Sequence, residues 1–285
     1  MLGSCFADNI AAKMGEYYFR VTANPFGTLY NPLSIAEAWH LQEVPDLVEW
    51  GGLWHSMFHH GDYSASDRNV ALSRCNKSIE VLQKAIRESN VVIITFGTAW
   101  VYEQHGRVVA NCHKMPASQF TRRRLGVEEI VSVWQPIITA YRDKHFIFTV
   151  SPIRHVKDGL HENQLSKATL LLAVERLVQA TGCSYFPAYE ILLDELRDYR
   201  FYADDMLHPT PLAINYIWER FLQTYMATDT QYEMRTLHHL YRDRHHTLLH
   251  PDSPESQQFI RQLRSREVAL AETYPWILTH SDMLR

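Results

Sequence analysis

The sequence predicts an α/β protein built on a parallel β-sheet. Two apolar runs, VVIITF (Val91–Phe96) and HFIFTV (His145–Val150), are rich in β-branched and aromatic residues, as are strands buried on both faces. A segment of helical period precedes the first run, at residues 73–89, and another follows the second run, at residues 164–180. Strands that alternate with helices of this length form parallel sheets with right-handed crossovers.

Further elements follow the same reasoning. The run CSYFPA (residues 183–188) predicts a weaker third strand, and residues 127–141 and 213–226 have helical period. The arginine run at residues 122–124 is interpreted as the solvated start of a helix. Residues 7–19 also predict a helix. In an α/β fold a strand should precede this helix in the sequence. Only Met1 and Leu2 precede the Gly-Ser pair before it, so we expect that strand to be missing or to begin upstream.

Length and composition limit the class of protein. The chain has 285 residues, enough for one large α/β domain, assigned to residues 1–227. Residues 228–285, rich in Arg, His, Glu and Gln, predict a helical C-terminal extension. The formal net charge of -4 argues against nucleic acid as a partner, and no apolar run is long enough to span a membrane. The oligomeric state stays open.

Four cysteines lie far apart in the chain. None of them forms a CxxC pair, so we expect reduced thiols rather than a zinc site or a disulfide framework. The first residues, MLGSCFADN, lack the basic and apolar regions of a secretory signal, which predicts a cytoplasmic protein. The loop HHGD holds three side chains that could bind a metal, without partners at a suitable spacing elsewhere, and we expect no metal and no other cofactor.

Two motifs carry candidate catalytic groups. Asp205 lies three residues before His208 in DDMLHPT, and a carboxylate beside an imidazole fixes its tautomer and stabilises the imidazolium. Ser4 follows Gly3 at a strand-to-helix turn, where free N–H groups face an incoming oxyanion. Taken singly, the pair also fits a surface ion pair and Ser4 also fits a helix N-cap. The same helix start is expected to acidify the neighbouring Cys5, an alternative nucleophile.

Several segments together resemble one family. GSCFADN is similar to the motif that names the GSCFA family, a branch of the SGNH (GDSL-like) hydrolases. The segments NPFGTLYNP, TFGTAWVYE, TVSPIRHVKDG, NQLSKATL and YRFYADDMLHPT resemble that family too, in the expected order from residue 1 to about residue 218. The resemblance implies a three-layer α/β/α, flavodoxin-like SGNH fold with a central parallel sheet.

The resemblance also implies roles for individual residues. Ser4 corresponds to the nucleophile, and Asp205 and His208 correspond to its acid–base partners. The backbone N–H groups of Ser4 and Gly27 correspond to oxyanion donors. The asparagine that usually provides a further donor is absent. Either Thr98 substitutes through its hydroxyl or backbone N–H, or another residue provides the donor, or the activity is low.

Other residues are candidates for contacts with the substrate. Ser151, Arg154 and His155 follow the second strand, at the carboxyl edge where α/β proteins bind ligands. Arg154 suits a carboxylate or phosphate, although these residues also fit a capped helix start with solvated basic neighbours. His60 is expected to contact substrate from a lid loop. Asn163 and Lys167 are weaker candidates for the mouth of the site.

The function implied by the resemblance is ester hydrolysis. The expected substrate carries a small acyl or acetyl group on a small molecule or a carbohydrate. Two alternatives stay open at this point. One is acyl transfer through the same acyl-enzyme, and the other is a non-catalytic binding module that retains the fold.

Overall fold

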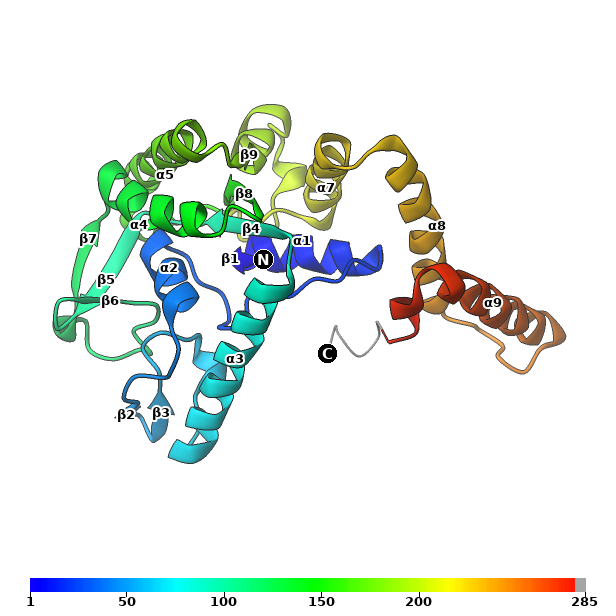
Figure 1. Cartoon of the computed structure of the whole chain (residues 1–285), viewed down its shortest axis with the longest axis horizontal. Helices are drawn as coiled ribbons and strands as arrows, with labels where there is room; N and C mark the ends of the chain where they lie inside the picture. Colours follow the sequence, from blue (N-terminus) through cyan, green and yellow to red (C-terminus); the bar gives the residue numbers. More distant parts are fainter. Residues whose placement is uncertain (280–285) are drawn as a thin grey trace. The chain divides into compact units, whose positions relative to one another are not determined.

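A four-stranded parallel sheet forms the centre of the computed structural model, which describes residues 1–279 (Figure 1). In sheet order its strands are β1 (Leu2–Gly3), β4 (Val91–Phe96), β8 (His145–Val150) and β9 (Ser184–Phe186). Strands β4 and β8 pair in parallel over their whole length, and all but their first residues are buried. The predicted α/β fold with a central parallel sheet is therefore confirmed.

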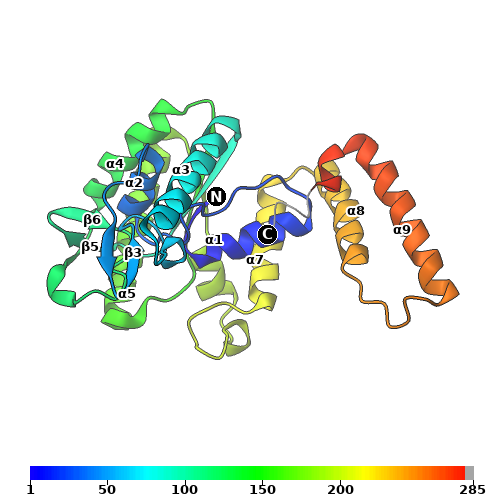
Figure 2. The same cartoon turned by 90° about the horizontal axis from the view of Figure 1, so that it is seen from below.

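Helices flank this sheet (Figures 1 and 2). The α-helices are α1 (Cys5–Glu16), α2 (Pro32–His40), α3 (Arg68–Glu88), α4 (Val127–Ala140), α5 (Leu160–Thr181), α6 (Ala188–Glu190), α7 (Pro211–Tyr225), α8 (Thr228–Arg244) and α9 (Pro254–Thr273). Helix α3 begins earlier than its apolar period predicts, because the Asp67 side chain accepts the Val70 N–H at 3.0 Å and caps it. Within residues 1–279, no helix is long and apolar enough to cross a membrane.

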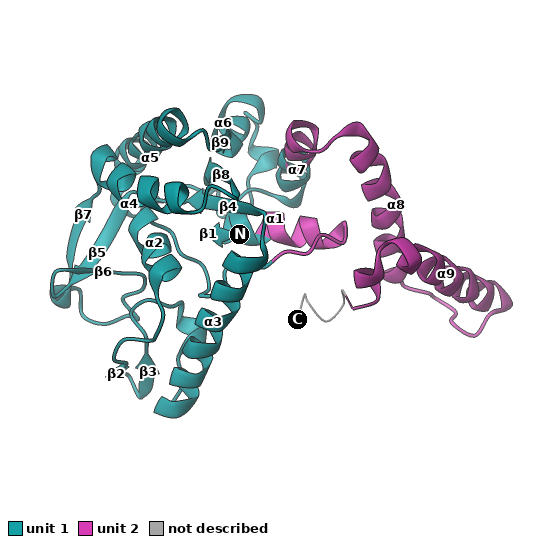
Figure 3. Cartoon of the chain, viewed as in Figure 1, with its two compact units in different colours: residues 1–8, 22–217 teal, residues 9–21, 218–285 magenta. Residues whose placement is uncertain are grey.

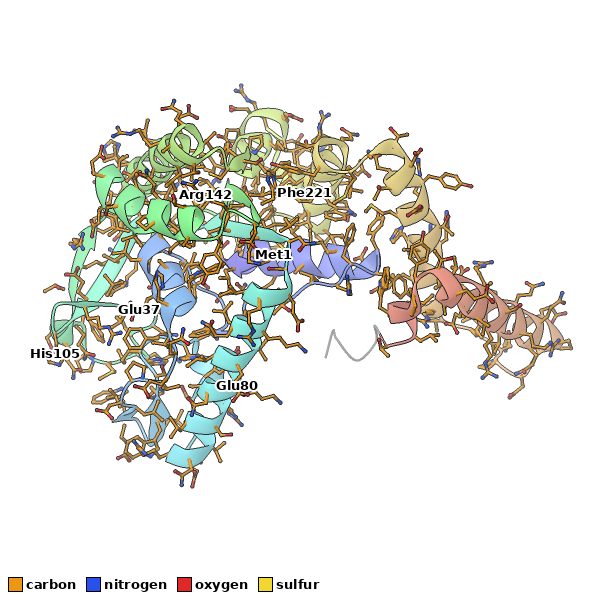
Figure 4. The ribbon with its side chains drawn as sticks, viewed as in Figure 1. Met1, Glu37, Glu80, His105, Arg142 and Phe221 are labelled. Atoms are coloured by element: carbon orange, nitrogen blue, oxygen red, sulfur yellow. The ribbon has the colours of Figure 1, made fainter. Side chains whose placement is uncertain are left out.

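An aromatic cluster joins helix α4 to the sheet. Trp134 of α4 packs against Phe96 of β4 and Phe148 of β8, with ring centroids 5.5 and 5.4 Å apart, and none of the three side chains is exposed. Buried aromatic rings contribute strongly to core stability. In the view with side chains, Glu80 marks α3 and Arg142 marks the end of α4, two of the helices beside this core (Figure 4).

Short antiparallel strands form two further sheets that the sequence did not predict. They are β5 (Trp100–Gln104), β6 (Arg107–Val109) and β7 (Thr121–Arg124), and the hairpin β2 (Val48–Trp50) with β3 (Leu53–His55). The arginine run is thus the strand β7 and not a helix start, so that prediction is wrong. Ion pairs explain the strand: Arg123 contacts Glu103 of β5 at 2.8 Å and Glu129 at 2.6 Å.

Short helical segments lie in the loops between the main helices and strands. These segments are η1 (Gly61–Tyr63), η2 (Ala117–Gln119), η3 (Val156–Asp158), the π-helical η4 (Ile191–Glu195), η5 (Tyr199–Phe201) and η6 (Pro275–Leu278).

The chain divides into two compact units (Figure 3). The first contains residues 1–8 and 22–217, and the second contains residues 9–21 together with the chain from residue 218 onward. Residues 9–21 join the second unit because Tyr18 belongs to its core, and the expected domain boundary after residue 227 stays a prediction. That core comprises Tyr18, Leu237, Leu240 and Ile277. The C-terminal segment is helical as predicted, with α8 and α9. All the candidate site residues lie in the first unit.

Candidate active site

The turn between β1 and α1 places Ser4 at the carboxyl edge of the sheet. Strand β1 is the strand expected before this helix, and it has two residues in the described chain. Gly3 has φ +147°, and a Cβ there would lie 2.2 Å from the Thr95 carbonyl oxygen, so the close approach of β1 to β4 requires glycine. The Ser4 hydroxyl accepts the Phe6 N–H at 3.3 Å and donates to Ser151 Oγ at 3.0 Å.

Ser151 is the immediate neighbour of Ser4. It follows β8 and is 0% exposed, while Ser4 is 1% exposed. In this conformation the Ser151 hydroxyl is enclosed and accepts a hydrogen bond from Ser4, and substrate contact by Ser151 stays a prediction. Both hydroxyls are therefore closed off from solvent in this conformation.

A buried lysine lies beneath this pair. Lys167 of α5 donates from Nζ to the carbonyl oxygens of Gly97 at 2.7 Å and Ser151 at 2.6 Å. Burial lowers the pKa of Lys167 to about 7. The sequence suggested Lys167 for the mouth of the site, but it is 1% exposed. Its role in the structure is to tie together the chain ends that follow β4 and β8.

Asp205 and His208 form a hydrogen-bonded pair before α7. The His208 Nδ1 lies 2.6 Å from Asp205 Oδ2, while Asp205 Oδ1 accepts the backbone N–H groups of Leu207 and His208. These backbone hydrogen bonds, with the imidazole contact, lower the pKa of Asp205 to about 2. An ionised carboxylate at Nδ1 favours the tautomer with its hydrogen on Nδ1, which leaves the Nε2 lone pair to take up a proton.

Arg154 connects this pair to the strand edge. Its guanidinium donates to the Met206 carbonyl oxygen at 3.3 Å and lies 4.2 Å from the centroid of the Tyr202 ring. The guanidinium contacts the loop that carries His208, and the predicted role as a clamp for a substrate carboxylate or phosphate stays a prediction. Arg154 therefore holds that loop to the segment after β8.

Two predicted oxyanion donors are engaged elsewhere. The Gly27 N–H donates to the Asn24 carbonyl at 2.7 Å, and the Thr98 N–H donates to the Tyr30 carbonyl at 2.9 Å. The Thr98 hydroxyl pairs with Ser166 Oγ at 3.1 Å. In this conformation neither position presents a donor to Ser4, because the turns at the strand edge use them. The N–H of Ser4 is the third predicted donor, and its role stays a prediction.

His60 and Gly27 line one pocket of about 570 Å³. Gly27 has φ +76°, and a Cβ there would meet His60 Cβ at 2.2 Å, so the two chain segments touch at a glycine. The pocket is lined by Asp8, Asn24, Pro25, Gly27, Thr28, His60, Asp62, Tyr63, Arg74, Lys77, Ser78 and Val81. This position suits the substrate contact predicted for His60, which stays a prediction.

His155 follows Arg154 and is partly buried. Its backbone N–H donates to Asn163 Oδ1 at 2.9 Å, and its ring lies edge-on to Tyr30 with centroids 5.7 Å apart. Asn163 was a candidate for the mouth of the site, but it is 3% exposed and instead fixes the backbone of His155.

His59, the neighbour of His60, is fully buried. Its Nδ1 lies 2.7 Å from Ser56 Oγ and its Nε2 lies 2.9 Å from Ser78 Oγ, and its ring stacks on Phe26 at 4.2 Å. Burial lowers the pKa of His59 to about 3. Among residues 1–279 no three His, Cys, Asp or Glu side chains are grouped to hold a metal ion.

The burial of His59 predicts acid-sensitive stability. The unfolded chain binds a proton at His59 near pH 6.5 and the folded chain only near pH 3, so the stabilisation is complete above pH 6.5 and is lost as the pH falls. We expect the free energy of unfolding of the native protein to fall about 1.4 kcal/mol per pH unit more steeply than that of His59→Gln below pH 6. Denaturant titrations at several pH values measure this difference. His40→Gln, at an exposed position, should keep the native slope; a native slope in His59→Gln would refute the assignment.

Cys5 differs from the expectation of an acidified thiol. Burial raises its pKa, and this effect outweighs the backbone hydrogen bonds and the charge of Lys167 that lower it. A thiol with a raised pKa is a weak nucleophile. The arrangement therefore favours Ser4 over Cys5 as the nucleophile at this turn.

The fold and the site define an α/β protein with a Gly-Ser turn after its first strand and an Asp-His pair before α7. The sequence matches the GSCFA family over residues 1–221, and the chain belongs to this family. Searches among curated proteins and solved structures give no match.

Proposed function

We propose that this protein is a serine-dependent hydrolase of the SGNH type that cleaves a small ester. The observation that carries the proposal is the 2.6 Å contact between Asp205 and His208, which prepares Nε2 to accept a proton. Arg154 holds their loop to the segment after β8, and Ser151 in that segment contacts the Ser4 hydroxyl. Nucleophile and base thus belong to one connected edge of the sheet.

The proposed reaction has two halves. In the first, Ser4 Oγ attacks the ester carbonyl carbon while His208 Nε2 takes the hydroxyl proton, and the tetrahedral intermediate collapses as the alcohol leaves with that proton. In the second, water attacks the acyl-enzyme and gives a proton to His208, which returns it to Ser4 Oγ as the Oγ–acyl bond breaks and the acid leaves. Asp205 stabilises the imidazolium in both halves.

The pocket beside Gly27 suggests a polar substrate. It is lined by carboxylates, Asp8 and Asp62, and by cations, Arg74 and Lys77. Such mixed polar groups suit the hydroxyls of a carbohydrate better than a long acyl chain. We therefore favour an acetyl or other small acyl group on a polar, hydroxylated alcohol.

Covalent labelling tests the nucleophile directly. A fluorophosphonate probe should phosphonylate Ser4, and peptide mass spectrometry should locate the adduct there. Labelling should disappear in Ser4→Ala and persist in Ser132→Ala, which changes an exposed serine on α4. An adduct on Cys5, or equal labelling of Ser4→Ala, contradicts the proposal.

Acyl transfer is a second candidate, and the burial of Ser4 favours it. A nucleophile that is 1% exposed is shielded from water, and exclusion of water protects an acyl-enzyme from hydrolysis. A sugar hydroxyl bound in the neighbouring pocket would then receive the acyl group. Product analysis with added acceptor sugars separates the two: acylated sugar indicates transfer, and free acid alone indicates hydrolysis.

A further inference from the structure

One imidazole nitrogen in the site is buried without a partner. Nε2 of His155 is shielded from solvent and makes no hydrogen bond to any of residues 1–279. Buried polar atoms in folded proteins are nearly always paired, because an unpaired one costs stability. Such an atom beside a candidate nucleophile indicates that a group arriving with the substrate is its partner.

Gly97 shows where this nitrogen lies. A Cβ at Gly97 would be 3.3 Å from His155 Nε2 and 3.5 Å from Ser4 Cβ. The imidazole edge and the Ser4 side chain therefore flank the same face of one glycine, and a side chain at position 97 would separate them. Asn163 and Tyr30 hold His155 at this place through its backbone N–H and its ring.

The ring of His155 is held neutral. Burial, then the charges of Lys167 and His208, lower its pKa to about 3. A neutral imidazole donates a hydrogen bond from an N–H without giving up the proton, whereas a base with so low a pKa takes a serine proton poorly. His155 thus differs from His208, whose Nδ1 contacts the Asp205 carboxylate.

We propose that the Nε2–H of His155 donates a hydrogen bond to the oxyanion formed when Ser4 attacks an ester, and this rests on the proposed function. In that step the Ser4 Oγ–carbon bond forms, the carbonyl π pair moves to oxygen, and the serine proton passes to His208. His155 keeps its proton throughout. It provides the donor that Gly27 and Thr98 do not provide, since theirs are engaged.

Two variants at position 155 test the role. His155→Gln retains an amide N–H donor, and His155→Leu fills the space without one. We expect His155→Leu to lower kcat for p-nitrophenyl acetate by about 10²–10³ with little change in KM, as for the loss of one oxyanion donor. His155→Gln should recover at least about tenfold of that loss. The rate of fluorophosphonate labelling, whose phosphonyl oxygen occupies the same position, should follow the same order.

Thermal stability separates catalysis from structure. Because His155→Leu removes an unpaired buried nitrogen, its Tm should be equal to or above that of the native protein while its labelling rate falls. Native rates in His155→Leu, equal losses in both variants, or a joint fall of Tm and rate would overturn the assignment. Ser4→Ala is measured alongside: undiminished turnover there refutes the proposed function itself, whereas loss in Ser4→Ala with native rates in His155→Leu refutes only the role of His155.

Discussion

Replacement of Ser4 by alanine is expected to lower kcat/KM for p-nitrophenyl acetate by at least about 10³-fold. In the proposed mechanism this hydroxyl forms the acyl-enzyme, and burial raises the pKa of the neighbouring Cys5, which weakens the thiol as an alternative nucleophile. The hydrogen bonds that the Ser4 hydroxyl makes to Ser151 and from Phe6 contribute about 1 kcal/mol each at most, so the variant should stay folded. Steady-state release of p-nitrophenol measures the effect.

Two controls make this measurement specific. Cys5→Ala removes the thiol and should keep at least half of the native turnover. Ser132→Ala removes an exposed hydroxyl on α4 and should be indistinguishable from the native protein. Equal turnover in Ser4→Ala and the native protein, with circular dichroism showing both folded, would remove Ser4 from the mechanism. Loss of turnover in Cys5→Ala alone would assign the chemistry to the thiol.

The buried strands were predictable because one local property specifies them. Runs of β-branched and aromatic residues exist only where both faces of a strand are covered, and β4 and β8 occupy the predicted residues 91–96 and 145–150. The strands of the smaller sheets give no such signal. Strand β7 reads TRRR, and in its pairing with β5 the Arg123 side chain contacts Glu103, twenty residues earlier in the sequence. Local propensity does not contain that information.

The sequence motifs of the candidate site could be predicted, but the contacts between residues distant in the sequence could not. The spacing of Asp205 and His208 in one loop allows their hydrogen bond, and Gly3 before Ser4 fits the turn between β1 and α1. The contact of Ser4 with Ser151 depends instead on the order β1-β4-β8, which brings two strand ends 147 residues apart to one edge. No pattern in the sequence gives that order.

The burial of the Lys167 side chain could not be predicted from the sequence either. On α5 it occupies a position within a broad apolar face, where a lysine usually reaches out to water. Here the chain ends after β4 and β8 present the carbonyls of Gly97 and Ser151 to its ammonium group. A buried cation requires such partners, and they exist only once the sheet has formed. Burial, and after it the charge of Lys167, lowers the pKa of His155.

Loss of the base is expected to be as severe as loss of the nucleophile. His208→Ala should lower kcat for p-nitrophenyl acetate by at least about 10³-fold, because the proposed mechanism assigns the removal of the Ser4 proton to this imidazole. Asp205→Asn should lower it by up to about 10⁴-fold. With a pKa of about 2, Asp205 is ionised throughout the neutral range, whereas an asparagine amide can present its own N–H to Nδ1 and favour the wrong tautomer.

A neighbouring carboxylate supplies the matched control. Asp204 is exposed and precedes Asp205 in the same loop, so Asp204→Asn makes the same change of charge without touching the imidazole contact. It should retain native kcat, and the double variant Asp205→Asn/His208→Ala should be no slower than His208→Ala alone, since the two residues act as one unit. Additive losses in the double variant would contradict this unit. Equal effects of Asp204→Asn and Asp205→Asn would show that Asp205 acts through its surface charge and not through its contact with the His208 imidazole.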